Sequence, residues 1–387
     1  MQKTTSIAGL FLLALPAFSQ TTPDDAIRAA LQNHPSVRAA AFEVQAKKHN
    51  EKAALNLPNP EVNAESPTGE FYAVGVQQAF EFPTVYARQK QVAKAETALA
   101  QASRMVSEND LRYTIRSLYL DAQVAEYQAR QWADRDSLYR QISAAAIRQF
   151  AAGEVDFLQK TRAENEAGQA HQERLAAERL AESLRQQLVT YTGLMNLGNL
   201  LPLHPDTVGL AQQPLAQINP NVAYSQQAVQ VAETQVRLAK SKALPNFSLG
   251  YLNQGARNTP TDYRFRASIG IPLWAGQYRA GANAAKAETQ AAMARAEAQT
   301  QAVALEWQRA QSELATALAA VQYYEQEALP RSRALIAAAV RMREAGQADY
   351  ATFLRTLDEA FAIQREYAEQ VLDLNSTQLR LRHLSGN

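Results

Sequence analysis

Five histidines are the residues of this chain best suited to metal or acid–base chemistry, and their spacing supports neither. His34, His49, His171, His204 and His383 are scattered, and they never recur at the intervals of a metal-binding motif. The chain has no cysteine, which excludes disulfides, zinc–thiolate sites, a cysteine nucleophile and N-terminal lipidation on cysteine. It also lacks a glycine-rich phosphate loop and a nucleophile elbow. We therefore expect no enzyme activity, no cofactor and no metal site.

Four short segments alternate between apolar and polar residues with a period of two, which is typical of β-strands with one apolar face. They are residues 59–66, 71–82, 246–254 and 263–271. Turn-forming residues separate the members of each pair, so the sequence predicts two β-hairpins.

Each predicted hairpin has one bulky apolar face and one small, polar face. The apolar face consists of Tyr72, Val74, Val76, Phe80, Phe247, Leu249, Tyr251, Phe265 and Ile269. The opposite face includes Gln77, Glu81, Arg264 and Arg266. Two interpretations of Arg264 and Arg266 remain open: they line the inside of a channel as a positively charged wall, or they are solvated charges on an exposed sheet face.

Long helices must position these hairpins. Residues 84–152 contain neither glycine nor proline, so they predict one helix of roughly 100 Å at about 1.5 Å per residue. A second long helix follows Trp274, and Pro330 is expected to kink it. Gly153 and Gly346 follow these helices, where a left-handed cap favours glycine.

The same order of elements occurs twice: a helix, a hairpin, a long helix, a glycine turn and a returning helix. His34-Pro35 is matched by Asn219-Pro220, and Ala152-Gly153 by Ala345-Gly346. Asp156 and Asp349 are placed to cap the two returning helices, just as Asp24 and Asp25 are placed to cap the first helix. The predicted fold is mainly α with a small β part, duplicated as repeats 20–200 and 218–387 around a linker at 201–217.

Residues 1–19 are typical of a secretory signal. Lys3 precedes an apolar stretch, and Ala17-Phe18-Ser19 fits a small-x-small cleavage site. No later window has the ~20 apolar residues of a membrane helix. The net charge of +1 gives no reason to expect nucleic acid as a partner. We expect an exported protein.

Amphipathic strands in an exported chain raise the question of what covers them. Four strands cannot close a barrel, since outer-membrane barrels need at least about eight. Three chains would pool twelve strands, and the helices would continue that barrel as a tube. In such a barrel the apolar face contacts lipid and the polar face lines the lumen. The alternative is a soluble periplasmic coiled-coil scaffold or adaptor protein.

The doubled order of elements resembles the TolC-like outer membrane efflux proteins. Its most specific parts are Tyr323-Tyr324, Leu329-Pro330 and Ala345-Gly346 in the second repeat, with Arg148 to Gly153 as the counterpart in the first. The resemblance implies a homotrimer in the outer membrane with a twelve-stranded β-barrel and a long periplasmic α-helical barrel. It also implies a periplasmic adaptor and an inner-membrane transporter, of the RND type, as partners. The compact length is similar to that of the cation-efflux branch.

The resemblance places both glycine turns at the periplasmic tip, where the adaptor docks. The implied docking residues are Gly153, Asp156, Gly346, Asp349, Thr352 and Arg355. In the family's founding member, carboxylates on the second-repeat tip helix help close the tunnel entrance. This chain has Thr352 and Arg355 at the comparable positions, with Asp349 and Asp358 nearby.

Overall fold

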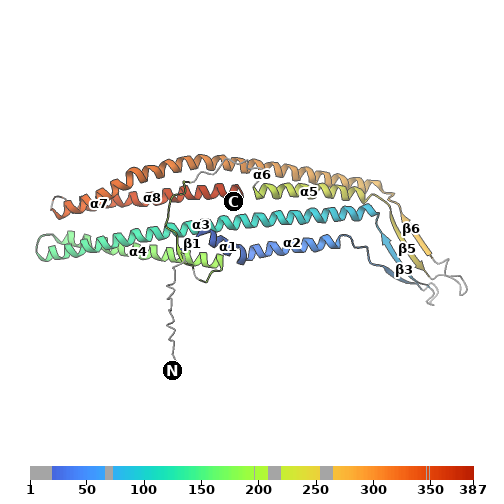
Figure 1. Ribbon diagram of the computed structural model, residues 1–387, viewed down its shortest axis with the longest axis horizontal. Helices are drawn as coiled ribbons and strands as arrows, with labels where there is room; N and C mark the ends of the chain where they lie inside the picture. Colours follow the sequence, from blue (N-terminus) through green and yellow to red (C-terminus); the bar gives the residue numbers. More distant parts are fainter. Residues whose placement is uncertain are drawn as a thin grey trace, which may run out of the picture. The chain divides into compact units, whose positions relative to one another are not determined.

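The structure of the protein is a computed structural model that describes residues 20–65, 73–195, 197–207, 219–252, 265–345, 347 and 349–387. The predicted signal segment 1–19, Tyr72, Arg264, Gly346 and most of the linker lie outside the described residues. The described part is mostly helical with few strands (Figure 1), so the expected fold class is confirmed at that level. The chain divides into two compact units, each assembled from three stretches of sequence.

One unit contains residues 31–114, 207–318 and 377–387, and it holds the β-sheet. Each hairpin is entered and left through a helix: α2 (Pro35–Ala53) and α3 (Pro83–Ala151) flank the first, and α5 (Pro220–Ser241) and α6 (Ala275–Tyr323) flank the second. The core of this unit includes Val222, Trp307 and Leu381.

The sheet has four strands: β2 (Glu61–Glu65), β3 (Ala73–Phe80), β5 (Asn246–Leu252) and β6 (Phe265–Gly270). Their order is β2-β3-β5-β6, and every neighbouring pair is antiparallel. Both predicted hairpins are confirmed. The pairing of β3 with β5, which the sequence did not predict, joins the hairpins into one sheet.

The first long helix is confirmed, since α3 runs unbroken for 69 residues. The second is interrupted as Pro330 suggested. A π-helical turn, Tyr324–Ala328, separates α6 from α7 (Leu329–Glu344), and the N–H of Leu329 bonds to the carbonyl of Tyr324. Proline has no N–H and its ring crowds the preceding turn, which explains a widened turn at this point.

The other unit contains residues up to Ala30, 115–206 and 319–376. It includes most of α1 (Pro23–Asn33), α4 (Phe157–Thr192), α7 and most of α8 (Tyr350–Leu384). Its larger core combines alanines with bulkier residues: Tyr139, Ala146, Ala163, Ala167, Ala170, Ala339, Tyr350, Phe353, Leu357 and Phe361. Alanines on α3, α4 and α7 let these helices approach closely, while α8 contributes most of the large side chains and α3 contributes Tyr139.

The start of α1 corrects one prediction. Thr22, not Asp24 or Asp25, caps this helix: its hydroxyl accepts from the N–H of Asp25 at 3.2 Å, and the Asp25 carboxylate accepts from the N–H of Thr22 at 3.3 Å. Asp25 instead fills the third helical position of a reciprocal capping box. The break between α1 and α2 lies at Pro35, because the residue before a proline prefers extended backbone; His34 has φ −68° and ψ 132°.

A short parallel bridge pairs β1 (Gln20–Thr21) with β4 (Asn199–Leu200). The buried hydroxyl of Tyr119 on α3 lies between the two segments. It donates to the carbonyl of Thr21 at 2.7 Å and accepts from the N–H of Leu201 at 2.8 Å. One tyrosine therefore fixes both the start of the described chain and the segment that follows α4.

Candidate functional site

The strand register separates the two predicted faces of the sheet. Val76 lies opposite Val62 on one side and Tyr251 on the other, and Tyr251 lies opposite Phe265. Phe80, Phe247 and Ile269 form a second such row. Opposite strand residues point to the same side of a sheet. The residues predicted for the apolar face therefore share one face wherever they are described.

This apolar face is open to the surroundings in the single chain. The side chain of Val76 is 48% exposed and that of Phe265 is 79% exposed, and Val74, Leu249, Tyr251 and Ile269 are exposed as well. Contiguous exposed apolar surface of this kind marks a surface that meets another apolar phase or partner.

The opposite face carries the predicted polar residues Gln77 and Arg266, which fall in one row with Glu61 and Gly250. Gln77 donates from Nε2 to the hydroxyl of Ser248 at 3.1 Å. Glu81 was expected in the same strand, but it follows the end of β3, and its N–H donates to the Tyr86 hydroxyl at 2.9 Å. That bond redirects the backbone toward α3, so Glu81 is not a strand residue.

The turn between α3 and α4 has the geometry that its glycine predicted. Gly153 has φ +75°, and the N–H of Glu154 bonds to the carbonyl of Gln149 at 2.8 Å, as in a Schellman cap. Asp156 then caps α4 by accepting from the N–H of Gln159 at 2.7 Å.

The turn between α7 and α8 is built in a similar way. The carboxylate of Asp349 accepts from the N–H groups of Ala351 and Thr352, and the Thr352 hydroxyl donates to it at 2.7 Å. These bonds, the backbone bond from Thr352 foremost, hold the pKa of Asp349 below its usual value. Thr352 therefore supports the cap, while Arg355 is exposed on the first turns of α8.

Contacts bring the two turns close together. Arg343, near the end of α7, donates to the side chain of Gln149 near the end of α3 at 3.5 Å. Its guanidinium also lies 5.3 Å from the ring of Tyr350 at the start of α8. Gly153, Asp156, Asp349, Thr352 and Arg355 are thus placed at one end of this unit.

An exposed aromatic pair at the first turn was missed by the sequence reasoning. Phe150 and Phe157 flank Gly153, and their ring centroids are 6.3 Å apart in an edge-on arrangement. The ammonium of Lys160 lies 5.5 Å from the ring of Phe150 and 6.0 Å from that of Phe157. The sequence did contain a signal for this pair, since one phenylalanine stands on either side of a turn that should lie at the surface. Two apolar side chains without a core partner are unusual in such a position.

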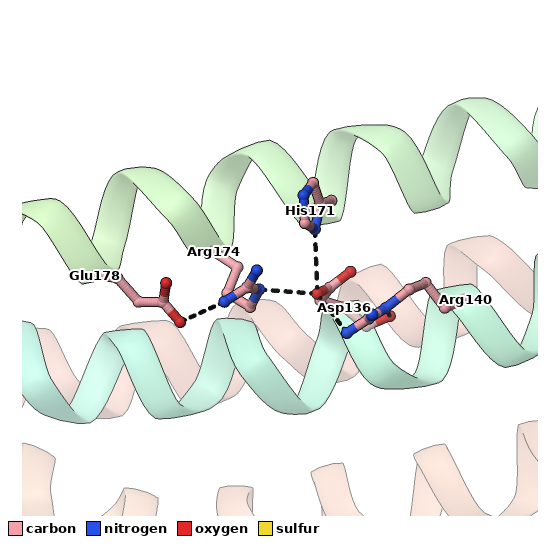
Figure 2. A network of polar contacts seen from close by, with 5 residues as sticks. All are labelled: Asp136, Arg140, His171, Arg174 and Glu178. Atoms are coloured by element: carbon pink, nitrogen blue, oxygen red, sulfur yellow. Dashed lines mark hydrogen bonds and ion pairs between the residues drawn. The ribbon is translucent and has the colours of Figure 1, made fainter.

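A second feature that the sequence did not indicate is a polar network centred on Asp136 of α3 (Figure 2). The Asp136 side chain is fully buried, and its Oδ2 accepts from Arg140 at 2.8 Å and from Arg174 of α4 at 2.9 Å. His171 of α4 lies 3.5 Å from the same oxygen, through Nδ1. Burial alone would raise the pKa of Asp136, but His171 and the two arginines hold it below its usual value. The carboxylate is therefore ionised at neutral pH and ties α3 to α4.

Arg135, one residue earlier on α3, ties that helix to α8. Its guanidinium lies between the rings of Trp132 and Phe361, 4.6 and 4.2 Å from their centroids, and it donates to the carbonyl of Phe361 at 2.7 Å. Tyr139, one turn further, donates to Asp358 at 3.2 Å. Cations stacked on aromatic rings and bonded to backbone hold helices at a fixed spacing.

Two searches of the described residues bear on other functions. No three His, Cys, Asp or Glu side chains gather there so as to hold a metal ion. None of the helices in the described ranges combines the length and the apolar character needed to cross a bilayer.

Comparison with known proteins gives a family match for the second half of the sequence and the fold of the chain. Residues 211–387 match the family model described as "Outer membrane efflux protein". None of the curated proteins matches the sequence.

Solved structures are similar over nearly the whole chain. A crystal structure of CusC, described together with transmembrane channel formation, is 16% identical with a TM-score of 0.81 and covers 100% of this chain and 98% of its own. The outer-membrane channel OprN is 17% identical with a TM-score of 0.80, covering 94% and 89%. The outer membrane protein VceC from Vibrio cholerae is 16% identical with a TM-score of 0.75, covering 94% and 96%. The resemblance seen in the sequence is confirmed: residues 211–387 match the outer membrane efflux protein family, and the chain has the fold of the TolC-like channels.

Proposed function

We propose that the protein is the outer-membrane exit duct of a tripartite efflux or secretion system. The observation that carries this proposal is the four-stranded antiparallel sheet, whose apolar face is exposed and whose outer strands, β2 and β6, each have only one neighbouring strand among the residues that the structure describes. Open sheet edges do not occur in lipid. The sheet therefore needs further strands before it can lie in a membrane.

Copies of the chain itself can supply those strands. Because the number of strands is even, β2 and β6 run in opposite directions, so β6 of one copy meets β2 of the next as an antiparallel pair. Three copies give twelve strands, in line with the homotrimer that the family resemblance implies. The apolar residues then face lipid, and Gln77, Arg264 and Arg266 face the lumen.

The helices complete the proposed duct as a long α-helical barrel in the periplasm. The division into repeats 20–200 and 218–387, with a linker at 201–217, is supported by the matching order of elements in the two halves. In the first half this order is α2, β2, β3, α3 and α4, and in the second half it is α5, β5, β6, α6–α7 and α8. In this reading residues 1–19 are a signal peptide removed on export. Substrates would reach the duct from an inner-membrane transporter, of the RND type, through a periplasmic adaptor.

Membrane fractionation followed by sizing tests this function. We expect the protein in the outer-membrane fraction, and light scattering in detergent should give the mass of a homotrimer. A soluble periplasmic monomer with folded strands would overturn the proposal and favour the scaffold or adaptor alternative.

We further propose that the end of the helical unit with both turns is the site where the adaptor docks. The implied contact residues are Gly153, Asp156, Gly346, Asp349, Thr352 and Arg355. The exposed rings of Phe150 and Phe157 support this assignment, because aromatic side chains at a surface turn commonly anchor a protein partner.

Gly153→Val is expected to leave the trimer in the outer membrane but abolish export. An L-residue at φ +75° costs roughly 1–2 kcal/mol, and a β-branched one is worse placed. A Cβ at this position would meet nothing within 4 Å, so the strain lies in the backbone of the turn and the adaptor would meet an altered shape. The measurement is export-dependent resistance beside the amount of outer-membrane trimer. Gly153→Asn is the control, since asparagine tolerates this conformation; full resistance in the valine variant would show that this turn is not the docking end.

A further inference from the structure

A groove between the end of α5 and the start of α6 lies at the foot of the sheet. Its volume is about 270 Å³, and its floor includes Ala243, Pro272 and Ala275. Lys240, Arg279 and Tyr278 also line it. Small apolar side chains with two cations and one phenol form a surface suited to a ligand with an anionic and an apolar part.

The two cations are not neutralised by the protein. Lys240 and Arg279 are exposed, no carboxylate lines the groove, and neither cation has an ion-pair partner anywhere in the part of the chain that the structure describes. The groove is therefore locally positive although the whole chain carries a net charge of only +1.

The other side of the same helix pair differs in character. A second groove, of about 600 Å³, is lined there by Gln235, Lys242 and Gln277. At 3.6 residues per turn, Lys240 projects from α5 more than a third of a turn away from Gln235. The two grooves share Tyr278, but the larger one contains a single cation, Lys242, beside two amide side chains, whereas the smaller one contains two cations and no amide side chain.

Large apolar side chains adjoin the smaller groove. Leu273 is 76% exposed and Trp274 is 78% exposed, directly after Pro272 and directly before Ala275. Tryptophan is enriched where a membrane protein passes from hydrocarbon to water, because its ring is apolar and its N–H is polar. This segment marks the level at which the apolar face of the sheet ends.

We propose that this groove binds the headgroup of an anionic phospholipid. The inference rests on the proposed function, since it needs the sheet to lie in a membrane. The phosphate accepts hydrogen bonds from the Lys240 ammonium, the Arg279 guanidinium and the Tyr278 hydroxyl, and the acyl chains run along Leu273 and Trp274 toward the apolar face. Guanidinium groups bind phosphate oxygens in a bidentate manner, so Arg279 selects phosphate while Lys240 adds charge.

The test compares the double variant Lys240→Gln/Arg279→Gln with Arg295→Gln/Arg309→Gln. The control removes two exposed positive charges from α6 further from the sheet. Full-length protein in detergent is titrated with phosphatidylglycerol or with phosphatidylcholine, and bound lipid is counted by native mass spectrometry. The wild type and the control should prefer phosphatidylglycerol, and the Lys240/Arg279 variant should lose about tenfold or more in its affinity for that lipid.

Three results would overturn the inference: equal affinity of the wild type for both lipids, equal loss in both variants, or full displacement of the lipid by millimolar inorganic phosphate, which would make this a free-phosphate site. Fractionation of the same cells separates this outcome from failure of the proposed function. A normal outer-membrane trimer without lipid preference overturns only the headgroup site, whereas absence of the protein from the outer membrane overturns the duct itself.

Discussion

Val76→Arg is expected to remove most of the protein from the outer membrane, whereas Gln77→Arg leaves it there. Val76 is central in the row that runs from Val62 to Phe265, so its side chain would meet hydrocarbon. In the proposed trimeric barrel an arginine on the lipid face would cost about 2–4 kcal/mol at the midplane, and three copies of it would be present. The measurement is the amount of trimer recovered from outer membranes.

Gln77→Arg is the matched control because it introduces the same group one residue away, on the other face. It loses the hydrogen bond to Ser248, worth about 1 kcal/mol, but its charge enters the lumen. Ile269→Arg and Ser268→Arg repeat the comparison on β6. If both members of each pair lower the amount of trimer equally, the assignment of one face to lipid and the other to the lumen is wrong.

Leu357→Ala should produce the largest loss in free energy of unfolding in the unit that does not contain the sheet. Leu357 of α8 is fully buried among Tyr139, Tyr350, Phe353 and Phe361. Rings of this size cannot collapse into the space that an alanine leaves, so the cost is expected near the middle of the usual range, about 3 kcal/mol. Thermal or denaturant unfolding followed by circular dichroism measures it.

Leu180→Ala is the control for this experiment. Leu180 lies in the same unit on α4, but its side chain is 51% exposed, and such surface changes usually stay within about 0.5 kcal/mol. An equal loss in both variants would mean that the cluster around Leu357 is not the core of the unit.

The sequence predicted those elements whose cause is local. Alternation with a period of two predicted which residues of β3 and β6 share a face. The lack of glycine and proline predicted the uninterrupted helix α3, and Gly153 and Asp156 predicted the turn between α3 and α4. Thr22 was a missed local signal, since threonine followed three residues later by aspartate is itself a capping pattern.

Features that depend on distant residues were not predicted. The pairing of β3 with β5 joins residues such as Gln77 and Ser248, 171 positions apart, and no pattern within either hairpin specifies it. Asp136 and Arg135 were likewise indistinguishable from other charged residues of a long helix. Only the packing of α4 and α8 against α3 shows that these two are buried.

The way the chain alternates between its two units has a consequence for biogenesis. The chain passes from one unit to the other at residues 30/31, 114/115, 206/207, 318/319 and 376/377. Residues 377–387 are part of the unit with the sheet: Asn109 donates to the carbonyl of His383 and Asn219 to that of Leu384. Contacts between such distant residues make folding slow. The unit with the sheet should therefore form only once residues 377–387 can pack against α3 and α5, and deletion of residues 377–387 should leave its apolar surfaces open and the polypeptide prone to aggregation.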